Sequence, residues 1–253
     1  MLSPKPVAPA APFSGAARRA SPFAAMRRPA PAFLRRLVSF ELVALLALAP
    51  LLYIFQKTEP ARRNIAYWDE FDTAIAMLLR IAEKPTAERF VGEMFAINNE
   101  HRMVTSRLLF AANYAATGTV NFDFLNLAGN ATLIGLVALL VVHVRTRPRR
   151  LIMLLVLAAF YFQLQHYENF MWSGASIDHF QIVLLAAGAF VCVARNTWAG
   201  IACGAALATL ATFTLAHGVM TWPVGALLLW RAHNRRGLVL WGGIAAAALV
   251  GFL

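Results

Sequence analysis

Two short strings between residues 57 and 123 hold the side chains best suited to chemistry. Residues 67–72 read Tyr-Trp-Asp-Glu-Phe-Asp, and residues 98–102 read Asn-Asn-Glu-His-Arg. The segment from 57 to 123 carries nine of the 12 acidic residues, and apolar runs flank it on both sides. We expect a chain with its carboxylates gathered in this way to bind a ligand or catalyse a reaction in this segment.

The adjacent acids Asp69 and Glu70 are the predicted catalytic residues. A carboxylate can take the proton of an acceptor hydroxyl as a general base, and two neighbouring acids in a dry pocket raise one another's affinity for protons. We predict that Asp69 is the base, that Glu70 is its companion, and that Asp72 binds substrate. The alternative is that both acids only complement the positive N-terminal end of a helix.

The second string combines an acid, a titratable base and a permanent cation. Arg102 or Arg107 can hold a phosphate group through two parallel hydrogen bonds. The alternative for His101 is an ordinary surface position. The predicted substrate-binding residues in and near this string are Asn99, Glu100, His101, Arg102 and Arg107.

A further polar stretch, residues 165–172, reads Gln-His-Tyr-Glu-Asn-Phe-Met-Trp. Aromatic faces suit sugar rings and side-chain amides suit sugar hydroxyls, so Glu168, Asn169 and Trp172 are predicted to bind substrate. The alternative is an aromatic belt at a membrane interface with incidental polar neighbours. The Thr-Trp-Pro corner at 221–223 is expected to face the same cavity.

Other catalytic and metal-binding motifs are missing from the sequence. It contains no HExxH, P-loop, GxSxG or metal-spaced Cys/His pattern. A divalent metal therefore stays open, without a motif to place it. Cys192 and Cys203 lie in apolar runs and are interpreted as small core residues, with neither a disulfide nor a zinc site supported.

Composition indicates a polytopic membrane protein. Hydrophobic residues make up 60% of the chain, charged residues 14%, and the mean hydropathy is +0.61. The net charge of +11 is spread over short basic loops between apolar runs, which is typical of cytoplasmic membrane flanks rather than of nucleic-acid binding. Residues 1–36 are predicted to be a disordered, basic, cytoplasmic tail.

The apolar runs predict an all-α bundle of about seven membrane spans within residues 37–253. Basic flanks place the N-terminus inside and the 57–123 segment outside. The last run is still apolar at Leu253, so the chain is expected to end within a span. The predicted spans are 37–55, 124–144, 151–164, 179–194, 197–216, a short stretch ending at 230, and one starting at 237.

Within the 57–123 segment the apolar spacing predicts three short helices. They are residues 71–80, a helix capped by Thr86 with Phe90, Met94 and Ile97 on one side, and a helix over 103–116 that stops at Gly118. Short helices with apolar faces beside a membrane are expected to lie in its interface. They would cover the mouth of the bundle.

This layout resembles the GT-C superfamily of polytopic glycosyltransferases, which use lipid-phosphate-linked sugars. The similarity covers residues 37–236. Residues 67–70 stand where that family has its acidic motif, and residues 98–107 resemble the His-containing entry to its second loop helix. The resemblance implies that Asp69 is the catalytic carboxylate, that a polyprenyl-phosphate sugar is the donor, and that membrane lipids are partners. The chain departs from the family in having fewer spans.

Two other function classes remain open. A transporter or flippase of an amphipathic substrate predicts ionisable residues or broken helices within the membrane, and the predicted spans hold few such charges. The other class is a non-catalytic protein of envelope assembly, in which the polar segment would catalyse no reaction.

Overall fold

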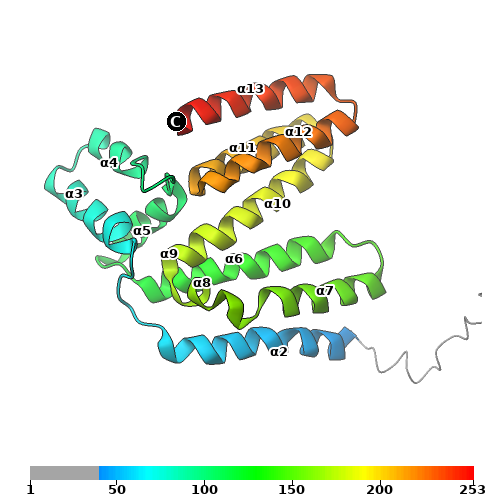
Figure 1. Cartoon of the computed structure of the whole chain (residues 1–253), viewed down its shortest axis with the longest axis horizontal. Coiled ribbons are helices and arrows are strands. Elements are labelled where there is room, and N and C mark those ends of the chain that lie inside the picture. Colours follow the sequence, from blue (N-terminus) through cyan, green and yellow to red (C-terminus); the bar gives the residue numbers. More distant parts are fainter. Residues whose placement is uncertain (1–39) are drawn as a thin grey trace, which may run out of the picture. The chain divides into compact units, whose positions relative to one another are not determined.

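The computed structural model describes residues 40–253, and every regular element within that range is a helix (Figure 1). The predicted tail 1–36 and the first residues of the first predicted span lie outside the described residues. One isolated bridge pairs Asn98 with His101. The all-α prediction is therefore confirmed for the described chain.

Seven helical segments follow the order of the predicted spans. Three are long and apolar enough to cross a membrane: Phe122–Val142, Ser173–Ala194 and Arg235–Phe252. A fourth arises if Arg147–Tyr161 and Leu164–Met171, bent by 46°, form one span. The segments are α2 (Phe40–Thr58), α6 (Phe122–Val142), α7 (Arg147–Tyr161), the run α9–η5–α10 (Ser173–Ala175, Ser176–Phe180, Gln181–Ala194), α11 (Trp198–Thr214), α12 (Thr221–Arg231) and α13 (Arg235–Phe252). These helices are compatible with a membrane protein.

The fourth segment starts earlier than predicted. Residues 165–178 were expected to connect two spans, but they form η4 (Leu164–His166), α8 (Tyr167–Met171) and the first turns of the Ser173–Ala194 helix. The small polar residues Ser173, Gly174 and Ser176 look like a loop in sequence, yet all three are buried against other helices. Asp178 consequently lies inside a helix, one turn and a half from its start.

The corner at 221–223 belongs to the core and not to an outer surface. Trp222 is buried, and its ring centroid lies 4.8 Å from that of Trp241. Its indole N–H donates to Thr212 Oγ1 (2.9 Å), and the indole N–H of Trp241 donates to the Trp222 carbonyl (2.9 Å). Both indoles are thus satisfied inside the α11–α12–α13 core.

A tight 3₁₀ turn, η6 (Ala216–Met220), joins α11 to α12. A Cβ atom on Gly218 would overlap the backbone of Ala211 and Thr212. Only glycine therefore lets η6 fold back so closely on α11.

The polar segment forms η3 (Phe71–Ala76, a π-helical turn), α3 (Met77–Glu83), α4 (Ala87–Met94) and α5 (Val104–Thr117). Thr86 Oγ1 accepts a hydrogen bond from the Arg89 N–H (3.2 Å), and Gly118 ends α5 with φ +74°, as predicted. Ile97 lies beyond α4 and is exposed, so it does not share the apolar side with Met94.

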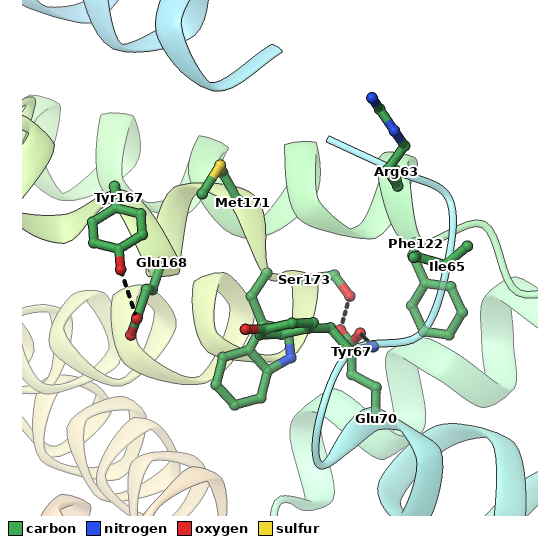
Figure 2. Close-up of a pocket in the computed structure, with 10 residues that line it drawn as sticks. Arg63, Ile65, Tyr67, Glu70, Phe122, Tyr167, Glu168, Met171 and Ser173 are labelled. Atoms are coloured by element: carbon green, nitrogen blue, oxygen red, sulfur yellow. Dashed lines mark hydrogen bonds between the residues drawn. The ribbon is translucent and has the colours of Figure 1, made fainter. Parts of the chain in front are cut away.

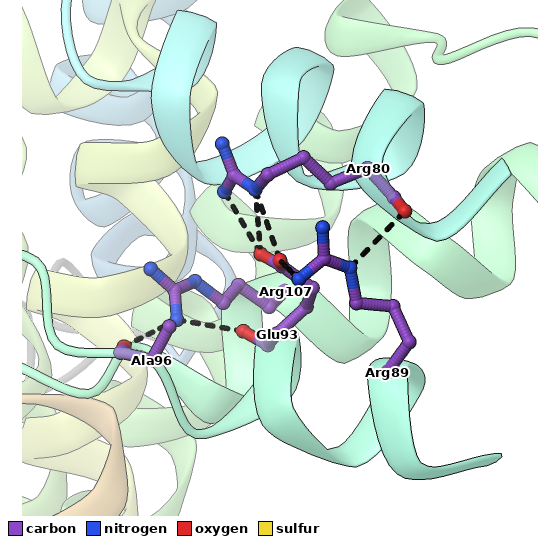
Figure 3. A network of polar contacts seen from close by, with 5 residues as sticks. All are labelled: Arg80, Arg89, Glu93, Ala96 and Arg107. Atoms are coloured by element: carbon purple, nitrogen blue, oxygen red, sulfur yellow. Dashed lines mark hydrogen bonds and ion pairs between the residues drawn. The ribbon is translucent and has the colours of Figure 1, made fainter. Parts of the chain in front are cut away.

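These short helices pack onto the bundle through a common apolar core. That core joins Met77, Met94 and Phe110 of the polar segment to Leu125 of α6 and Ile177 of η5. An ion-pair network ties α3 to α4: Arg80 donates three hydrogen bonds to the Glu93 carboxylate (2.8–3.0 Å), and Arg89 lies 3.6 Å from it (Figure 3).

Charge separates the two ends of the bundle. At one end, here the polar end, the 59–121 segment meets the start of the Ser173–Ala194 helix and the end of α13 (Figure 1). The other end, here the arginine end, holds the connections α6–α7, α10–α11 and α12–α13. Those three connections and the adjacent helix termini contain Arg145, Arg147, Arg149, Arg150, Arg195, Arg231, Arg235 and Arg236, and no acid.

Candidate functional site

A cavity of about 320 Å³ opens at the polar end of the bundle. Its wall is formed by the irregular segment before η3, by the start of α6, and by α8 with the first residue of α9 (Figure 2). The lining residues are Arg63, Ile65, Tyr67, Glu70, Phe122, Tyr167, Glu168, Met171, Trp172 and Ser173. The structure thus brings together Glu70, Glu168 and Trp172, which the sequence analysis had selected separately.

Glu70 is the most constrained acid in the cavity wall, with only 1% of its surface exposed. Its carboxylate accepts hydrogen bonds from the backbone N–H groups of Tyr67 (2.7 Å) and Gly174 (2.7 Å), and from the Ser173 hydroxyl. Ser173 and Gly174 open the Ser173–Ala194 helix, so Glu70 satisfies donors that no carbonyl of that helix can reach.

Burial raises the pKa of Glu70 above its ordinary value, and the hydrogen bonds from Ser173, Gly174 and Tyr67 oppose this rise. The expected alternative for the acid pair, support of a helix N-terminus, is therefore realised by Glu70. The supported helix is not its own, because Glu70 makes no side-chain cap on η3.

Three aromatic side chains form a cluster beside Glu70. Ring centroids lie 5.7 Å apart for Tyr67 and Trp68, 5.8 Å for Tyr67 and Trp172, and 6.1 Å for Trp68 and Trp172. Trp68 is 68% exposed, and its backbone is left-handed with φ +47°. The indole N–H of Trp172 is buried and lies close to the Glu70 carboxylate, whose pKa it helps to lower. The cluster offers open ring faces.

A second acid and a cation also line the cavity, on different sides of it (Figure 2). The Tyr167 hydroxyl donates to Glu168 Oε1 (3.0 Å). Arg63 lines the cavity while its guanidinium donates to the carbonyls of Pro60 (2.7 Å) and Arg62 (2.8 Å). The sequence analysis missed Arg63; the available signal was a basic pair directly after the first span.

Asp69 does not line the described cavity. Its side chain is half-buried, and its carboxylate has no hydrogen-bond or ion-pair partner in the part of the chain that the structure describes. Its carbonyl accepts from the Thr73 N–H (2.8 Å) and hydroxyl (2.8 Å). Asp72 is exposed on η3. The two adjacent acids therefore differ: the Glu70 carboxylate accepts hydrogen bonds, and the Asp69 carboxylate has no partner in the described residues.

The Asn-Glu-His-Arg string lies away from this cavity. Asn99 sits in a tight turn with φ +52°, and Glu100 Oε1 lies 3.5 Å from His101 Nε2. His101 Nδ1 accepts from the Ala216 N–H (3.2 Å), and the His101 ring centroid is 6.1 Å from that of His217. The string fastens the polar segment to the α11–α12 turn.

Both arginines that were predicted to hold phosphate donate to backbone carbonyls. Arg102 donates to Phe252 (2.7 and 2.9 Å) and Phe95 (2.6 Å). Arg107 is 3% exposed and donates to the carbonyls of Glu93 (2.8 Å) and Ala96 (Figure 3). Asn169, the remaining predicted residue, has its Oδ1 3.0 Å from His179 Nδ1 and does not line the cavity.

The arrangement combines two carboxylates, one cation and exposed aromatic faces in a single cavity. Such a set can hold a polar ring compound that carries an anionic group, and can accept a proton from it. No group of three or more His, Cys, Asp or Glu side chains in residues 40–253 is placed to hold a metal ion. Comparisons of the chain with protein-family models, with curated proteins and with solved structures find no match.

Proposed function

We propose that the protein is a membrane glycosyltransferase that resembles the GT-C superfamily. It would move a sugar from a polyprenyl-phosphate donor to an acceptor on the outer face of a bacterial inner membrane. The observation that carries the proposal is the cavity at the polar end, where carboxylates, a guanidinium and an aromatic cluster meet. The arginine end supports an orientation with that cavity outside. Three of the helical segments, or four with the bent pair, are long and apolar enough to cross a membrane, and a topology in which all seven cross is part of the proposal.

The proposed reaction needs a base, a cation and a sugar platform. The acceptor hydroxyl oxygen attacks the anomeric carbon, its proton passes to a carboxylate, and the bond to the donor phosphate breaks with its electron pair on that phosphate. Arg63 would offset the charge of the leaving phosphate, and the faces of Tyr67 and Trp68 would stack on the sugar.

Two carboxylates are candidates for the base. Asp69 does not line the cavity, but it directly precedes Glu70, and its carboxylate has no hydrogen-bond or ion-pair partner in residues 40–253. Glu168 lines the cavity and accepts one hydrogen bond, from Tyr167. Glu70 is assigned the supporting role, because its oxygens already accept three hydrogen bonds.

The test is turnover of the full chain in lipid nanodiscs with polyprenyl-phosphate sugars and a lipid acceptor. Loss of a general base lowers turnover by about 100-fold or more, so either Asp69→Asn or Glu168→Gln should do so. Glu83→Gln, at an exposed acid that ends the neighbouring helix α3, is the matched control and should retain activity. Wild-type turnover in both Asp69→Asn and Glu168→Gln would reject the proposal of a carboxylate base.

One observation favours the transporter alternative. Asp178 is an acid buried inside a helix that is long and apolar enough to cross a membrane, and such residues often mark transport or proton pathways. Uptake of a polyprenyl-phosphate sugar into vesicles, without a new glycosidic bond, would support this alternative over the transferase.

A further inference from the structure

Asp178 stands out among the buried acids because the Ser106 hydroxyl of α5 is the one side-chain donor close to it in the described chain. It lies in η5, the π-helical turn of the Ser173–Ala194 helix, and only 2% of its surface is exposed. Neither carboxyl oxygen has a hydrogen-bond partner in the described chain. π-turns within helices are frequent at functional sites, and a buried polar group without a partner is rare in a folded protein.

The guanidinium of Arg107 lies near this acid without pairing with it. Arg107 of α5 interacts electrostatically with the Glu93 carboxylate and, less strongly, with Asp178, and no hydrogen bond joins Arg107 to Asp178. The Nε of Arg107 is also buried and without a partner within residues 40–253. Ser106, the neighbouring residue on α5, lies close to the Asp178 carboxyl, but its hydroxyl donates to the Met103 carbonyl (3.0 Å). Acid and cation are thus near one another and both incompletely satisfied.

Apart from Arg107, the segments around Asp178 hold acids and no second Lys or Arg. Glu70, in front of η3, acts on Asp178 electrostatically. The acids of α6 and α8 are Asp123, at the start of α6, and Glu168, in the cavity; α9 and α10 contain no acid, Lys, Arg or His. His179 follows Asp178, but its ring contacts Asn169. Arg107 is therefore the cation available to Asp178.

An ionised carboxylate without donors is strongly disfavoured in an apolar interior, whereas its neutral form is tolerated. Two arrangements satisfy this requirement: a neutral Asp178 apart from Arg107, and an ionised Asp178 paired with it. Arg107 is anchored to the carbonyls of Glu93 and Ala96 at the end of α4. Pairing would therefore draw α4 and α5 toward the Ser173–Ala194 helix.

We propose that Asp178 is a proton-binding site whose occupancy controls the packing of α5 on the Ser173–Ala194 helix. The described arrangement holds the proton on the Asp178 carboxyl. Release of that proton to water leaves a carboxylate that pairs with Arg107 and closes α5 onto η5. This inference does not depend on the proposed transferase reaction.

Infrared spectroscopy of the full chain in nanodiscs, titrated with pH, tests the proton site. The wild type should show a protonated carboxyl stretch that disappears as the pH rises, and Asp178→Asn should lack that band. Glu70→Gln is the control for the other buried acid of this helix start, and should keep the band. Identical carboxyl spectra for wild type and Asp178→Asn across the titration would overturn the assignment.

The role of Arg107 has a separate test. Loss of an opposite charge favours the neutral acid, so Arg107→Met should move the disappearance of the band to higher pH by about one to three units. Arg107→Lys keeps the charge and guards against misfolding, and should move it less. An unchanged midpoint in a folded Arg107→Met variant would exclude Arg107 as the partner.

Hydrogen exchange of α5 amides tests the coupling. In the wild type, protection of α5 should increase over the same pH range in which the carboxyl band disappears, after correction for the intrinsic effect of pH on exchange. Asp178→Asn should show no such increase. An equal increase in both proteins would show that α5 packing does not follow the proton on Asp178.

Discussion

Two acids lie at the start of the Ser173–Ala194 helix, and they are almost equally buried. They differ in the number of hydrogen-bond donors around them. On the cavity face, Glu70 is 1% exposed and accepts three hydrogen bonds. On the interior face, Asp178 is 2% exposed and accepts none in the described chain. Burial alone therefore does not assign a role to an acid. The donors around it distinguish a carboxylate that supports a helix from one that can exchange a proton.

The largest expected effect separates these two acids by stability. Glu70→Ala removes three hydrogen bonds to a charged or partly charged group and leaves buried donors unpaired, so the free energy of unfolding should fall by about 3 kcal/mol or more. Asp178→Asn breaks no hydrogen bond and should change it by less than about 1 kcal/mol. Denaturant unfolding in one detergent measures both, and equal losses would contradict the comparison.

A smaller effect is expected from crowding the cavity face. A Cβ atom at Gly174 would lie 3.1 Å from Trp172 Nε1 and 3.5 Å from Glu70 Oε1. Gly174→Ala should therefore reduce the free energy of unfolding by about 1–2 kcal/mol. Gly92→Ala is the matched control, because a Cβ atom there meets nothing within 4 Å in α4, and it should raise stability by about 0.5–1 kcal/mol. Similar losses in both variants would argue against crowding.

Glu93 extends the comparison to an acid paired with cations. Its side chain is 9% exposed and accepts three hydrogen bonds from Arg80, whose own side chain is 39% exposed. Because solvent screens the exposed partner, Glu93→Gln should lower the free energy of unfolding by only about 1–2 kcal/mol at neutral pH. A double-mutant cycle with Arg80→Met measures the pair, and a coupling energy near zero would remove it as a stabilising contact.

The smallest effect is a difference in the sign of pH dependence. Burial raises the pKa of Glu70 in the folded state, so its contribution to stability is greatest below the unfolded pKa of about 4.3 and decreases as pH rises through the folded pKa. The hydrogen bonds from Arg80 lower the pKa of Glu93, so its contribution is present above about pH 4.3 and is lost as pH falls through the folded pKa. Stability of wild type minus that of Glu70→Gln and of Glu93→Gln, measured against pH, should have opposite slopes. Parallel slopes would contradict these assignments.

Local signals in the sequence predicted local structure well. Thr86 as a cap and Gly118 as a stop depend on the backbone within a few residues, and both are confirmed. The apolar runs predicted the order of the helices for the same reason. The start of the fourth segment was missed because Ser173, Gly174 and Ser176 favour a loop when their packing partners are unknown.

The site itself depends on contacts between distant residues. Glu70 meets Ser173 across 103 positions and Gly174 across 104, a pairing that no spacing rule reveals. Arg102 was predicted to bind phosphate because its chemistry allows it, but the end of α13 supplies a carbonyl acceptor. Asp178 was missed as a candidate because it was assigned to a polar connection.

The left-handed backbone of Trp68 places a strained residue within the aromatic cluster. A residue with a side chain in that conformation is disfavoured by about 1–3 kcal/mol relative to relaxed backbone, and stacking on Tyr67 and contact with Trp172 offset it. A ligand ring that took the place of Trp68 against Tyr67 or Trp172 would remove the contacts that hold the Trp68 indole. The Trp68 backbone would then be free to leave the left-handed conformation.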